Sequence, residues 1–397
     1  MFANKTIVIG ITGGIAAYKI ASLVSMLSKT EANVYVVMTE NGSRFIGPAV
    51  FDSLTGNRTM IDTFDRNHPF STEHVELAKA ADLFLLAPAT ANTVAKVAAG
   101  LADNMLTTTF LAADCPKLVA PSMNTRMLQN PATQENLATL RRRGITVIPS
   151  ASGHLACGDT GAGKMPEPEV LYGWICRELA REKDLAGKKV LITAGATQEP
   201  LDPVRFLTNH STGKMGMALA QEAMWRGAEV TLVRAACTVP APPFVQVVDV
   251  VTCADMFEAV SQRAAEQDIL IKAAAVADYT PETVADEKIK KKDGDLSIPL
   301  KRTTDILSWL GAHRREGQYL CGFSMETENM VENSMAKLAK KGCDMIVANN
   351  LKEAGSGFGT DTNGVTLITA AGAEPLPMMS KGDVAGAIFD HILAAGV

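Results

Sequence analysis

The sequence predicts an α/β protein built from two doubly wound domains, each with a mostly parallel sheet. Three observations lead to this prediction. Short runs of apolar and β-branched residues alternate with segments of helical periodicity along the chain. These runs are almost continuously apolar, as in parallel strands that are buried on both faces. The pattern then starts again near the middle of the 397 residues, and this length suits two domains.

The first half of the chain contains five such apolar runs. They predict strands at residues 6–10, 33–38, 83–87, 118–120 and 146–148. Helical periodicity predicts helices at residues 15–28, 92–101 and 131–142. Because helical segments separate strands that are apolar on both sides, we expect helices to cover both faces of one sheet.

A charged stretch at residues 177–189 separates the two halves. We therefore predict domains at residues 1–186 and 187–397. The second half begins again with two strands and a helix between them, predicted at residues 190–194, 214–226 and 229–233. Ligands of doubly wound sheets bind beyond the carboxyl ends of the strands, so the loops that follow the strands should carry the functional residues.

Composition and charge restrict the possible partners. Apolar residues make up 47% and charged residues 20% of the chain, which is ordinary for a globular protein. The 38 Lys and Arg against 43 Asp and Glu give a net charge of −5. Proteins that bind nucleic-acid backbones or anionic membranes are usually basic. We therefore expect neither partner, but a small anion in a local pocket.

Two further features indicate a cytoplasmic protein. No apolar run approaches the ~20 residues that a membrane-spanning helix needs. The seven cysteines are dispersed and include no C-x-x-C pair, which indicates reduced thiols and argues against a structural zinc site.

The loop after the first predicted strand contains two adjacent glycines, Gly13 and Gly14, followed by Ile15. Glycine lets the backbone approach a ligand, and the next helix offers its free N–H groups to a phosphate. The spacing is not G-x-G-x-x-G, and a tight turn that needs glycine explains the pair equally well.

The loop after the third predicted strand is rich in small and hydroxyl-bearing residues. They suit a flat ring that lies against the backbone, and they are Pro88, Ala89, Thr90, Asn92 and Thr93. Helix capping by Thr90 or Asn92 is the alternative, and it explains one of these residues but not all.

Three other residues of the first half could take part in chemistry. His74 precedes an Ala-rich helix, although a lone histidine is more often structural. Asn124 follows a strand and could position a carboxylate or cap a helix. Cys157 lies in a segment with four glycines in eleven residues, 153–163, which is typical of a mobile lid that exposes a reactive thiol.

The second half has several features that suit a nucleotide. Residues 207–216 combine hydroxyls, a glycine and a helix start into an anion cradle, but they lack the spacing of a Walker A loop. Asp278 follows small residues at a strand end and could contact a nucleotide or its magnesium. Lys288 begins a run of four lysines in five residues, for which a solvated surface is the commoner explanation. Lys337 and Lys341 are four apart and so share one helical face.

Several strings, in order along the chain, resemble two known families. G-I-T-G-G-I-A-A-Y-K, P-A-T-A-N-T, P-S-M-N-x-x-M and L-A-C-G-D-x-G-x-G resemble the flavin-dependent phosphopantothenoylcysteine decarboxylases. N-H-S-T-G-K-M-G, A-A-V-A-D-Y, K-I-K-K and D-x-I-V-A-N-N resemble the bacterial phosphopantothenate–cysteine ligases. Over its whole length, the chain is similar to the fused Dfp flavoproteins of coenzyme A biosynthesis.

The resemblance implies a flavodoxin-like, FMN-binding decarboxylase domain at residues 1–186 and a Rossmann-like ligase domain at residues 187–397. The ligase would use CTP and Mg²⁺ to convert 4′-phosphopantothenate into an acyl-cytidylate, which cysteine converts into phosphopantothenoylcysteine. The decarboxylase would oxidise the thiol of this product with FMN, release CO₂ and return the hydride, giving 4′-phosphopantetheine. The resemblance also implies a cytoplasmic homo-oligomer, a dodecamer of decarboxylase trimers and ligase dimers.

The resemblance further implies residue roles. His74 would be the active-site histidine, Asn124 the partner of the substrate carboxylate and Cys157 the proton donor of the reductive half. Lys288 would be needed to form the acyl-cytidylate, and Asn209 to convert it. The implied FMN contacts are Gly13, Gly14, Ile15, Thr39, Pro88, Ala89, Thr90, Asn92, Thr93, Asp103 and Asn104. The implied CTP contacts are Ala273, Ala274, Asp278, Lys288, Thr304, Asp305, Ile306, Leu307, Phe323, Lys337 and Lys341, with Asp278 also expected at the metal.

Three positions depart from the family pattern. Lys164 stands where arginine is expected, so the charge is kept but bidentate geometry is lost. Ser211-Thr212 replaces Ser-Ser, and Thr303-Thr304-Asp305 replaces Asn-Pro-Asp. The alternative functions are a flavin-binding regulatory or scaffold protein and a simple flavin electron carrier. The presence of His74, Asn124 and Cys157 together argues against a regulatory or scaffold protein, which would not need them. The second domain argues against a simple electron carrier, in which it would have no role.

Overall fold

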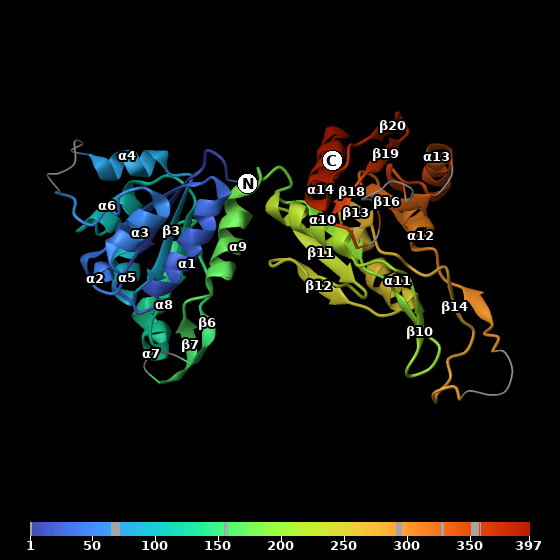
Figure 1. Cartoon of the computed structure of the whole chain (residues 1–397), viewed down its shortest axis with the longest axis horizontal. Coiled ribbons are helices and arrows are strands. Elements are labelled where there is room, and N and C mark those ends of the chain that lie inside the picture. Colours follow the sequence, from blue (N-terminus) through green and yellow to red (C-terminus); the bar gives the residue numbers. More distant parts are fainter. Residues whose placement is uncertain are drawn as a thin grey trace. The chain divides into compact units, whose positions relative to one another are not determined.

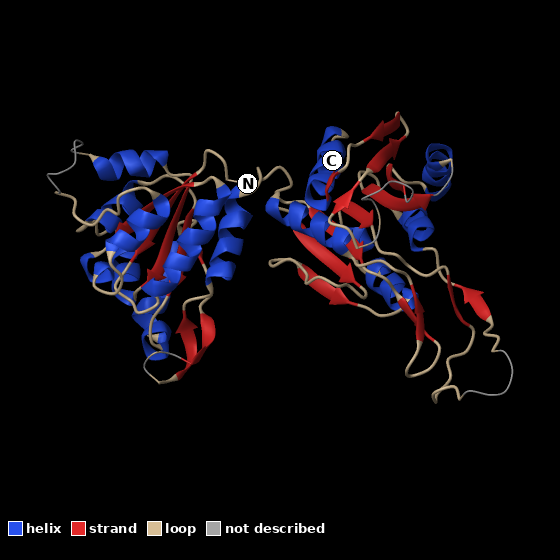
Figure 2. Cartoon of the chain, viewed as in Figure 1, coloured by secondary structure: helices blue, strands red, loops and turns tan. Residues whose placement is uncertain are grey.

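The computed structural model describes residues 2–64, 72–154, 156, 158–290, 296–326, 329–350, 357 and 359–397. The chain forms two compact units, of which the first ends at Arg181 and the second begins at Glu182 (Figure 1). Each unit has its own central sheet flanked by helices (Figure 2). All the strands and helices predicted from the sequence are present, with ends within two residues of the prediction.

The sheet of the N-terminal unit is entirely parallel, in the order β2-β1-β3-β4-β5. Its strands are β1 (Thr6–Ile11), β2 (Asn33–Met38), β3 (Leu83–Ala89), β4 (Lys117–Pro121) and β5 (Thr146–Val147). This order is that of flavodoxin-like folds, whose ligands bind where the order reverses, between the first and third strands. An antiparallel hairpin follows the sheet, formed by β6 (Ala151–His154) and β7 (Thr160–Lys164).

Helices cover both faces of this sheet, as the continuous apolar strands predicted. Buried side chains of α4, α5, α6 and α8 form one core cluster with β1, β3 and β4. On the other face, α1 packs against α3, α9 and β3. The helices are α1 (Ala17–Leu27), η1 (Ser28–Thr30), α2 (Glu40–Ser43), α3 (Pro48–Thr55), α4 (Glu73–Ala80), α5 (Ala91–Ala99), α6 (Met105–Ala112), α7 (Thr125–Gln129), α8 (Pro131–Arg142) and α9 (Pro168–Leu179).

The C-terminal unit has an eight-stranded sheet in the order β12-β11-β8-β13-β16-β17-β19-β20. The first six strands are parallel in the Rossmann-like order, and β19 and β20 are added antiparallel at one edge. The strands are β8 (Lys189–Ala194), β11 (Glu229–Arg234), β12 (Gln246–Asp249), β13 (Ile269–Lys272), β16 (Tyr319–Glu326), β17 (Met345–Asn350), β19 (Val365–Thr369) and β20 (Gly372–Pro375).

Two layers of helices cover this second sheet. Helices α10 and α14 share one core cluster with it, and α11, α12 and α13 share another. Gly216 lets α10 lie close to β8, because a Cβ atom there would be 2.4 Å from the Cβ of Ala194. The helices are α10 (Lys214–Trp225), α11 (Cys253–Ser261), η2 (Ala264–Glu266), α12 (Ile306–His313), α13 (Met330–Lys341) and α14 (Lys381–Ala394).

Short antiparallel pairs extend from the loops of this unit. Two of them frame the region discussed below: β9 (Gln198–Pro200) pairs with β10 (Phe206–Thr208), and β14 (Tyr279–Pro281) pairs with β15 (Leu300–Arg302). A third pair joins β18 (Thr362–Asn363) to β21 (Met379–Ser380). None of the helices in the described ranges combines the length and apolar composition needed to span a bilayer.

Candidate functional site

The N-terminal unit contains a cavity of about 830 Å³ where β1, β3 and β4 end. Gly13 and Gly14 line it from the loop after β1, and Thr90, which caps α5, lines it from the end of β3. Asn124 lines it after β4, and Gly163 lines it from the β6–β7 hairpin. The cavity therefore lies beyond the carboxyl ends of the strands, where ligands of this fold bind.

The two adjacent glycines differ in their surroundings. A Cβ atom on Gly13 would lie 2.6 Å from the Cβ of Asn41, so close packing requires glycine there. A Cβ atom on Gly14 would lie 3.7 Å from side-chain atoms of Pro88 and Thr90, which is an ordinary contact. A methyl group on Gly14 would therefore fit the protein but would occupy space at the cavity wall.

Asn124 caps helix α7 and also lines the cavity. Its Oδ1 accepts the backbone N–H of Arg126 at 2.8 Å, and its Nδ2 donates to Oδ2 of Asp159 at 3.0 Å. The helix cap that was the alternative interpretation is therefore present, and it holds the amide group at the cavity. The hairpin packs directly on this turn, because a Cβ atom on Gly163 would lie 2.2 Å from the carbonyl oxygen of Met123.

A carboxylate between two lysines lies beside the same cavity. Glu167 is paired with Lys19 at 2.7 Å and with Lys164 at 3.1 Å. Hydrogen bonds from Lys19 and then from Lys164 lower the pKa of the Glu167 carboxyl group. Because Lys19 and Lys164 both line the cavity, this carboxylate holds two ammonium groups at its wall.

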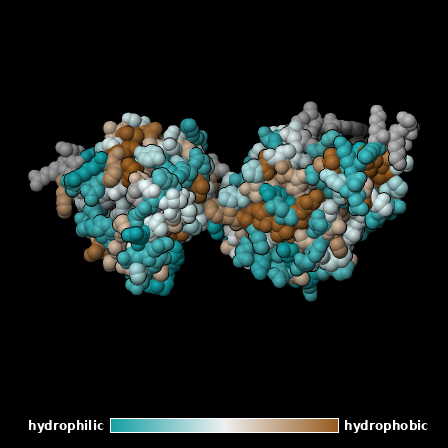
Figure 3. All heavy atoms as spheres, turned by 90° about the horizontal axis from the view of Figure 1, so that it is seen from below, coloured by the Kyte–Doolittle hydropathy of each residue, from teal (hydrophilic) through white to brown (hydrophobic). Residues whose placement is uncertain are grey.

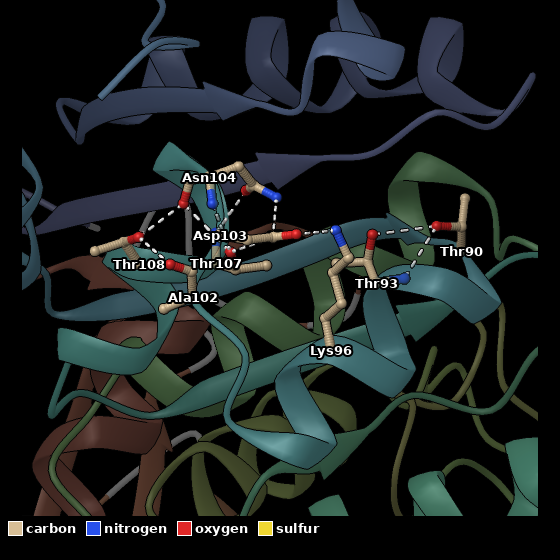
Figure 4. Close-up of polar contacts among 8 residues, drawn as sticks. All are labelled: Thr90, Thr93, Lys96, Ala102, Asp103, Asn104, Thr107 and Thr108. Atoms are coloured by element: carbon tan, nitrogen blue, oxygen red, sulfur yellow. Dashed lines mark hydrogen bonds and ion pairs between the residues drawn. The ribbon is translucent and has the colours of Figure 1, made fainter. Parts of the chain in front are cut away.

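Several residues predicted to contact the cofactor do not line this cavity. Figure 4 shows Asp103 ion-paired with Lys96, at 2.6 Å, and Asn104 hydrogen-bonded to Thr107 in the cap of α6. Thr39 caps α2 by accepting a backbone N–H at 3.0 Å. The predicted cofactor residues outside the lining are Thr39, Pro88, Ala89, Asn92, Thr93, Asp103 and Asn104.

The predicted catalytic residues of this unit are placed unequally. His74 is half-buried in α4 and is not on the cavity lining. Cys157 lies outside the described residues.

Two residues at this cavity were not predicted from the sequence. His154 of the hairpin lines the cavity, and the buried Thr12 joins the loops after β1 and β3. The Thr12 hydroxyl donates to the carbonyl oxygen of Pro88 at 2.5 Å and accepts a backbone N–H at 3.1 Å.

The C-terminal unit contains a cavity of about 460 Å³ where β13 and β16 end. Lys341 is ion-paired with Asp305, and Lys337 donates to the carbonyl oxygen of Phe323 at 3.3 Å. The two lysines therefore share one face of α13 toward the cavity, as their spacing predicted. The predicted nucleotide residues that line it are Asp278, Thr304, Asp305, Ile306, Leu307, Phe323, Lys337 and Lys341.

Two cationic residues of this cavity were not predicted, namely Lys272 at the end of β13 and Arg302 at the end of β15. The Lys272 ammonium group donates to the carbonyl oxygen of Ala274 at 2.9 Å. Burial, assisted by the charge of Lys337, lowers the pKa of Lys272 to about 8. The signal in the sequence was a lysine that ends an otherwise apolar strand, I-L-I-K.

The other predicted ligase residues are not on the lining of this cavity. Ala274, which follows Ala273 after β13, donates its N–H to the hydroxyl of Thr193 at 3.1 Å. Asn209 donates through Nδ2 to the carbonyl oxygen of Ala275 at 3.1 Å, so it lies against the same loop. Lys288 is exposed in the segment between β14 and β15.

The two cavities suit different ligands. The C-terminal cavity is lined by four cationic side chains, Lys272, Arg302, Lys337 and Lys341, and by two carboxylates, Asp278 and Asp305. This set of side chains suits several phosphates and a metal ion. The N-terminal cavity combines exposed glycine backbone, a hydroxyl group, two lysines and apolar side chains. It suits a large flat ring with an anionic group.

Two family models match the chain, and together they cover nearly all of it. A model described as Flavoprotein matches residues 1–180. A model described as DNA/pantothenate metabolism flavoprotein C-terminal domain matches residues 185–395.

Individual proteins are also similar over most of the chain. The coenzyme A biosynthesis bifunctional protein CoaBC of Bacillus subtilis (strain 168) is 45% identical over 99% of this chain and 98% of its own length. A cysteine/cysteine sulfinic acid decarboxylase from an unknown prokaryotic organism is 44% identical over 88% of this chain and 99% of its own length. The crystal structure of the C-terminal domain of a CoaBC protein is 42% identical and covers 53% of this chain and 96% of that domain, with a TM-score of 0.46.

Proposed function

The chain belongs to the family of bifunctional coenzyme A biosynthesis proteins, and we propose that its two units divide the two reactions of that family between them. The protein is an enzyme with ligase and decarboxylase activities. The C-terminal unit would join 4′-phosphopantothenate to cysteine, and the N-terminal unit would decarboxylate the product to 4′-phosphopantetheine. The observation that carries this division is that each unit has its own cavity at the carboxyl ends of its strands, and only the C-terminal one combines four cationic side chains with Asp278.

The ligase reaction proceeds in two displacements. A carboxylate oxygen of 4′-phosphopantothenate attacks the α-phosphorus of CTP, and pyrophosphate leaves with the electrons of the broken P–O bond. The amine of cysteine then attacks the acyl carbon, loses a proton and displaces CMP. The first step brings an anion to a polyanion, so Lys272, Lys337 and Lys341 would offset the repulsion at the cavity.

Two residues outside the cavity lining would complete each ligase step. Lys288 would approach the phosphates during formation of the acyl-cytidylate. The Asn209 amide group, held against the loop after β13, would donate to the acyl oxygen as the amine adds. Magnesium commonly binds one or two carboxylates together with substrate phosphates, so Asp278 would hold Mg²⁺ jointly with CTP.

The N-terminal cavity has features that fit FMN. The turn at Gly13 and Gly14 exposes backbone, Thr90 offers a hydroxyl group, and a side chain at Gly14 would take up cavity space. Lys19 and Lys164 supply positive charge for the phosphate or the substrate. Bound FMN supplies the two-electron oxidation of the substrate thiol and the later return of a hydride.

The protein's own groups would then bind the substrate and move protons. Asn124 would hold the substrate carboxylate at the cavity until CO₂ is lost. Cys157 would supply the proton that completes the reduced product, and His74 would serve as the active-site histidine. A purely regulatory or scaffold role is not favoured, because it leaves the cationic cavity of the second unit without a ligand.

We further propose that the enzyme acts in the cytoplasm as a homo-oligomer, a dodecamer of decarboxylase trimers and ligase dimers. Apolar side chains exposed on the β9–β10 and β14–β15 hairpins support ligase pairing, and they include Phe206, Tyr279 and Leu300. Figure 3 shows apolar surface gathered on the C-terminal unit.

The test is turnover by the purified full-length chain. With 4′-phosphopantothenate, cysteine, CTP and Mg²⁺, mass spectrometry should detect CMP, pyrophosphate and 4′-phosphopantetheine. Omission of CTP should abolish all three, whereas added phosphopantothenoylcysteine should still give 4′-phosphopantetheine. Absence of amide formation with every nucleoside triphosphate would overturn the ligase assignment, and intact phosphopantothenoylcysteine with FMN-loaded protein would overturn the decarboxylase assignment.

A further inference from the structure

A tight turn between β9 and β10 is hydrogen-bonded to the segment that carries Lys288. Three bonds join the two stretches. The N–H of Ala285 donates to the carbonyl oxygen of Leu201 at 3.0 Å, and the N–H of Ile289 donates to Oδ2 of Asp202 at 3.1 Å. The Arg205 guanidinium donates to the carbonyl oxygen of Ile289 at 2.9 Å. Lys288 therefore lies between two points at which its backbone is held.

Asp202 is the centre of this arrangement. Its side chain is buried, and its Oδ1 accepts the backbone N–H groups of Val204 and Arg205, each at 2.8 Å. Its Oδ2 accepts Nε and Nη2 of Arg205, at 3.0 and 2.5 Å, in addition to the N–H of Ile289. The pKa of the Asp202 carboxyl group lies well below its usual range, and the main cause is hydrogen bonding from the Arg205 side chain. One ionised carboxylate thus closes the turn with one oxygen and holds the Lys288 segment with the other.

The same turn leads directly to the second ligase residue. After Arg205 the chain forms β10, and Asn209 follows at its end. Thr208 donates its hydroxyl to the carbonyl oxygen of Thr197 at 2.8 Å, and Asn209 donates to Ala275 at 3.1 Å. The side chains of Thr208 and Asn209 are therefore tied to the loops that follow β8 and β13, while Arg205, just before β10, is tied through Asp202 to the Lys288 segment.

We infer that Asp202 is a positioning residue of the ligase, which sets the backbone at Lys288 relative to Asn209 and to the cationic cavity. The inference rests on the proposed ligase activity. Lys288 precedes the held residue Ile289 directly, so loss of the anchor changes where its ammonium group can reach. Misplacement of a reacting group by about 1 Å can reduce a rate about a hundredfold. Asp202 itself does not line the cationic cavity.

The informative variant is Asp202→Asn in the full-length chain. With its amide oxygen at the Oδ1 position, asparagine keeps the acceptor that closes the turn, but it presents an NH₂ group to Ile289 and Arg205. We expect the single-turnover rate of pyrophosphate release to fall about tenfold to a hundredfold, with an unchanged CTP dissociation constant. Trypsin should cleave after Lys288 faster than in the unsubstituted chain. Asp249→Asn is the matched control, because Asp249 pairs with Arg234 at 2.7 Å in the same unit.

A double substitution separates positioning from general damage. In a Lys288→Gln chain, Asp202→Asn should cause no further loss of pyrophosphate release, since the anchor acts through Lys288. If Asp202→Asn lowers the melting temperature by about 5 °C or more, Asp202→Glu takes its place, because it keeps the charge for Arg205 but moves the acceptor of Ile289. Two results would overturn the inference without touching the proposed function. One is pyrophosphate release at the unsubstituted rate in the Asp202 variant. The other is a loss of release in the Lys288→Gln chain as large as the loss that the same substitution causes in the otherwise unsubstituted chain. Absence of release from the unsubstituted chain would overturn the proposed function as well.

Discussion

Lys272 ends β13 with its ammonium group hydrogen-bonded to the carbonyl oxygen of Ala274, at 2.9 Å, within the cationic cavity of the C-terminal unit. Burial is the main cause that lowers its pKa to about 8, and the charge of Lys337 adds to the effect. The carboxylates of Asp305 and Asp278 act in the opposite direction but do not offset it. Lys272 therefore changes charge in a range where an ordinary lysine stays protonated.

This shift predicts a pH dependence of nucleotide binding. Below pH 8 Lys272 is protonated and attracts the phosphates, whereas above pH 8 the free protein loses this charge. The dissociation constant of CTP should therefore rise about 25-fold between pH 7.5 and pH 9.5, as expected for one group of pKa about 8 that must be reprotonated on binding. Isothermal titration calorimetry should also detect proton uptake above pH 8. Lys272→Met should bind CTP more weakly and without this pH dependence.

Lys340→Met provides the comparison, because Lys340 is an exposed residue of α13 and does not line the cavity. It should bind CTP like the unsubstituted chain at every pH. A pH profile of Lys272→Met that follows the unsubstituted chain would show that Lys272 is not the titrating group.

Substitutions in the glycine turn should distinguish a folding requirement from a cofactor requirement. Gly14→Ala places its methyl group 3.7 Å from Pro88 and Thr90, so the flavin-free protein should keep its melting temperature. The same methyl group takes up space at the cavity wall, and we expect FMN affinity to fall at least about tenfold, as for overpacking of a close contact. Gly13→Ala should instead lower the free energy of unfolding by about 1–3 kcal/mol, because its Cβ lies 2.6 Å from Asn41.

The measurements are the flavin absorbance bound per chain and thermal unfolding of the flavin-free protein. Gly47→Ala serves as the control, since no atom lies within 4 Å of a Cβ at that position. Normal FMN affinity in Gly14→Ala would place the flavin away from this turn.

The fold could be predicted from the sequence because its signals are strong and local. The strand at Leu83–Ala89 is buried along its whole length, and such runs can hardly be anything but strands of a covered parallel sheet. Asp103 and Asn104 illustrate where the sequence was less informative. The same residue types bind ligands and form structural contacts, and here Asn104 caps α6 and Asp103 pairs with Lys96. Sequence spacing does not distinguish these uses.

Other functional residues depend on packing that no local pattern reveals. The ammonium group of Lys19, at the cavity wall, pairs at 2.7 Å with Glu167, which is far away in the sequence. Asp202 similarly acts on a segment that begins more than eighty positions later, through Ile289. Long-range pairs of this kind become visible only when the sheet brings the loops together.

The buried ion network of Arg226 should make a large contribution to stability. Arg226 donates to Glu222 at 3.0 Å and to Asp184 at 3.1 Å, and it also pairs with Asp390 of α14. Glu222 and Arg226 are both buried. Arg226→Met should therefore lower the free energy of unfolding by about 3–5 kcal/mol, because it removes the guanidinium group that pairs with the buried carboxylate of Glu222.

Urea unfolding of the flavin-free chain, followed by tryptophan fluorescence, measures this effect. Arg234→Met breaks the more exposed pair with Asp249 and should cost less than about 1 kcal/mol. The double variant Glu222→Gln/Arg226→Met should regain part of the loss. Equal shifts for Arg226→Met and Arg234→Met would contradict the assigned importance of the network.

The measurement that tests the central claim most directly is rapid quenching of ligase variants, with the bound species identified by mass. The Asn209 amide group would donate a hydrogen bond to the acyl oxygen, whereas an aspartate presents an acceptor and a negative charge there. Loss of one hydrogen-bond donor at such an oxygen typically slows a step about 10²–10³-fold. Asn209→Asp should therefore release pyrophosphate once and accumulate 4′-phosphopantothenoyl-CMP. Lys288→Gln should release little pyrophosphate and accumulate no intermediate. Accumulation of the intermediate in the Lys288 variant, or its absence from the Asn209 variant, would contradict this assignment of the two steps.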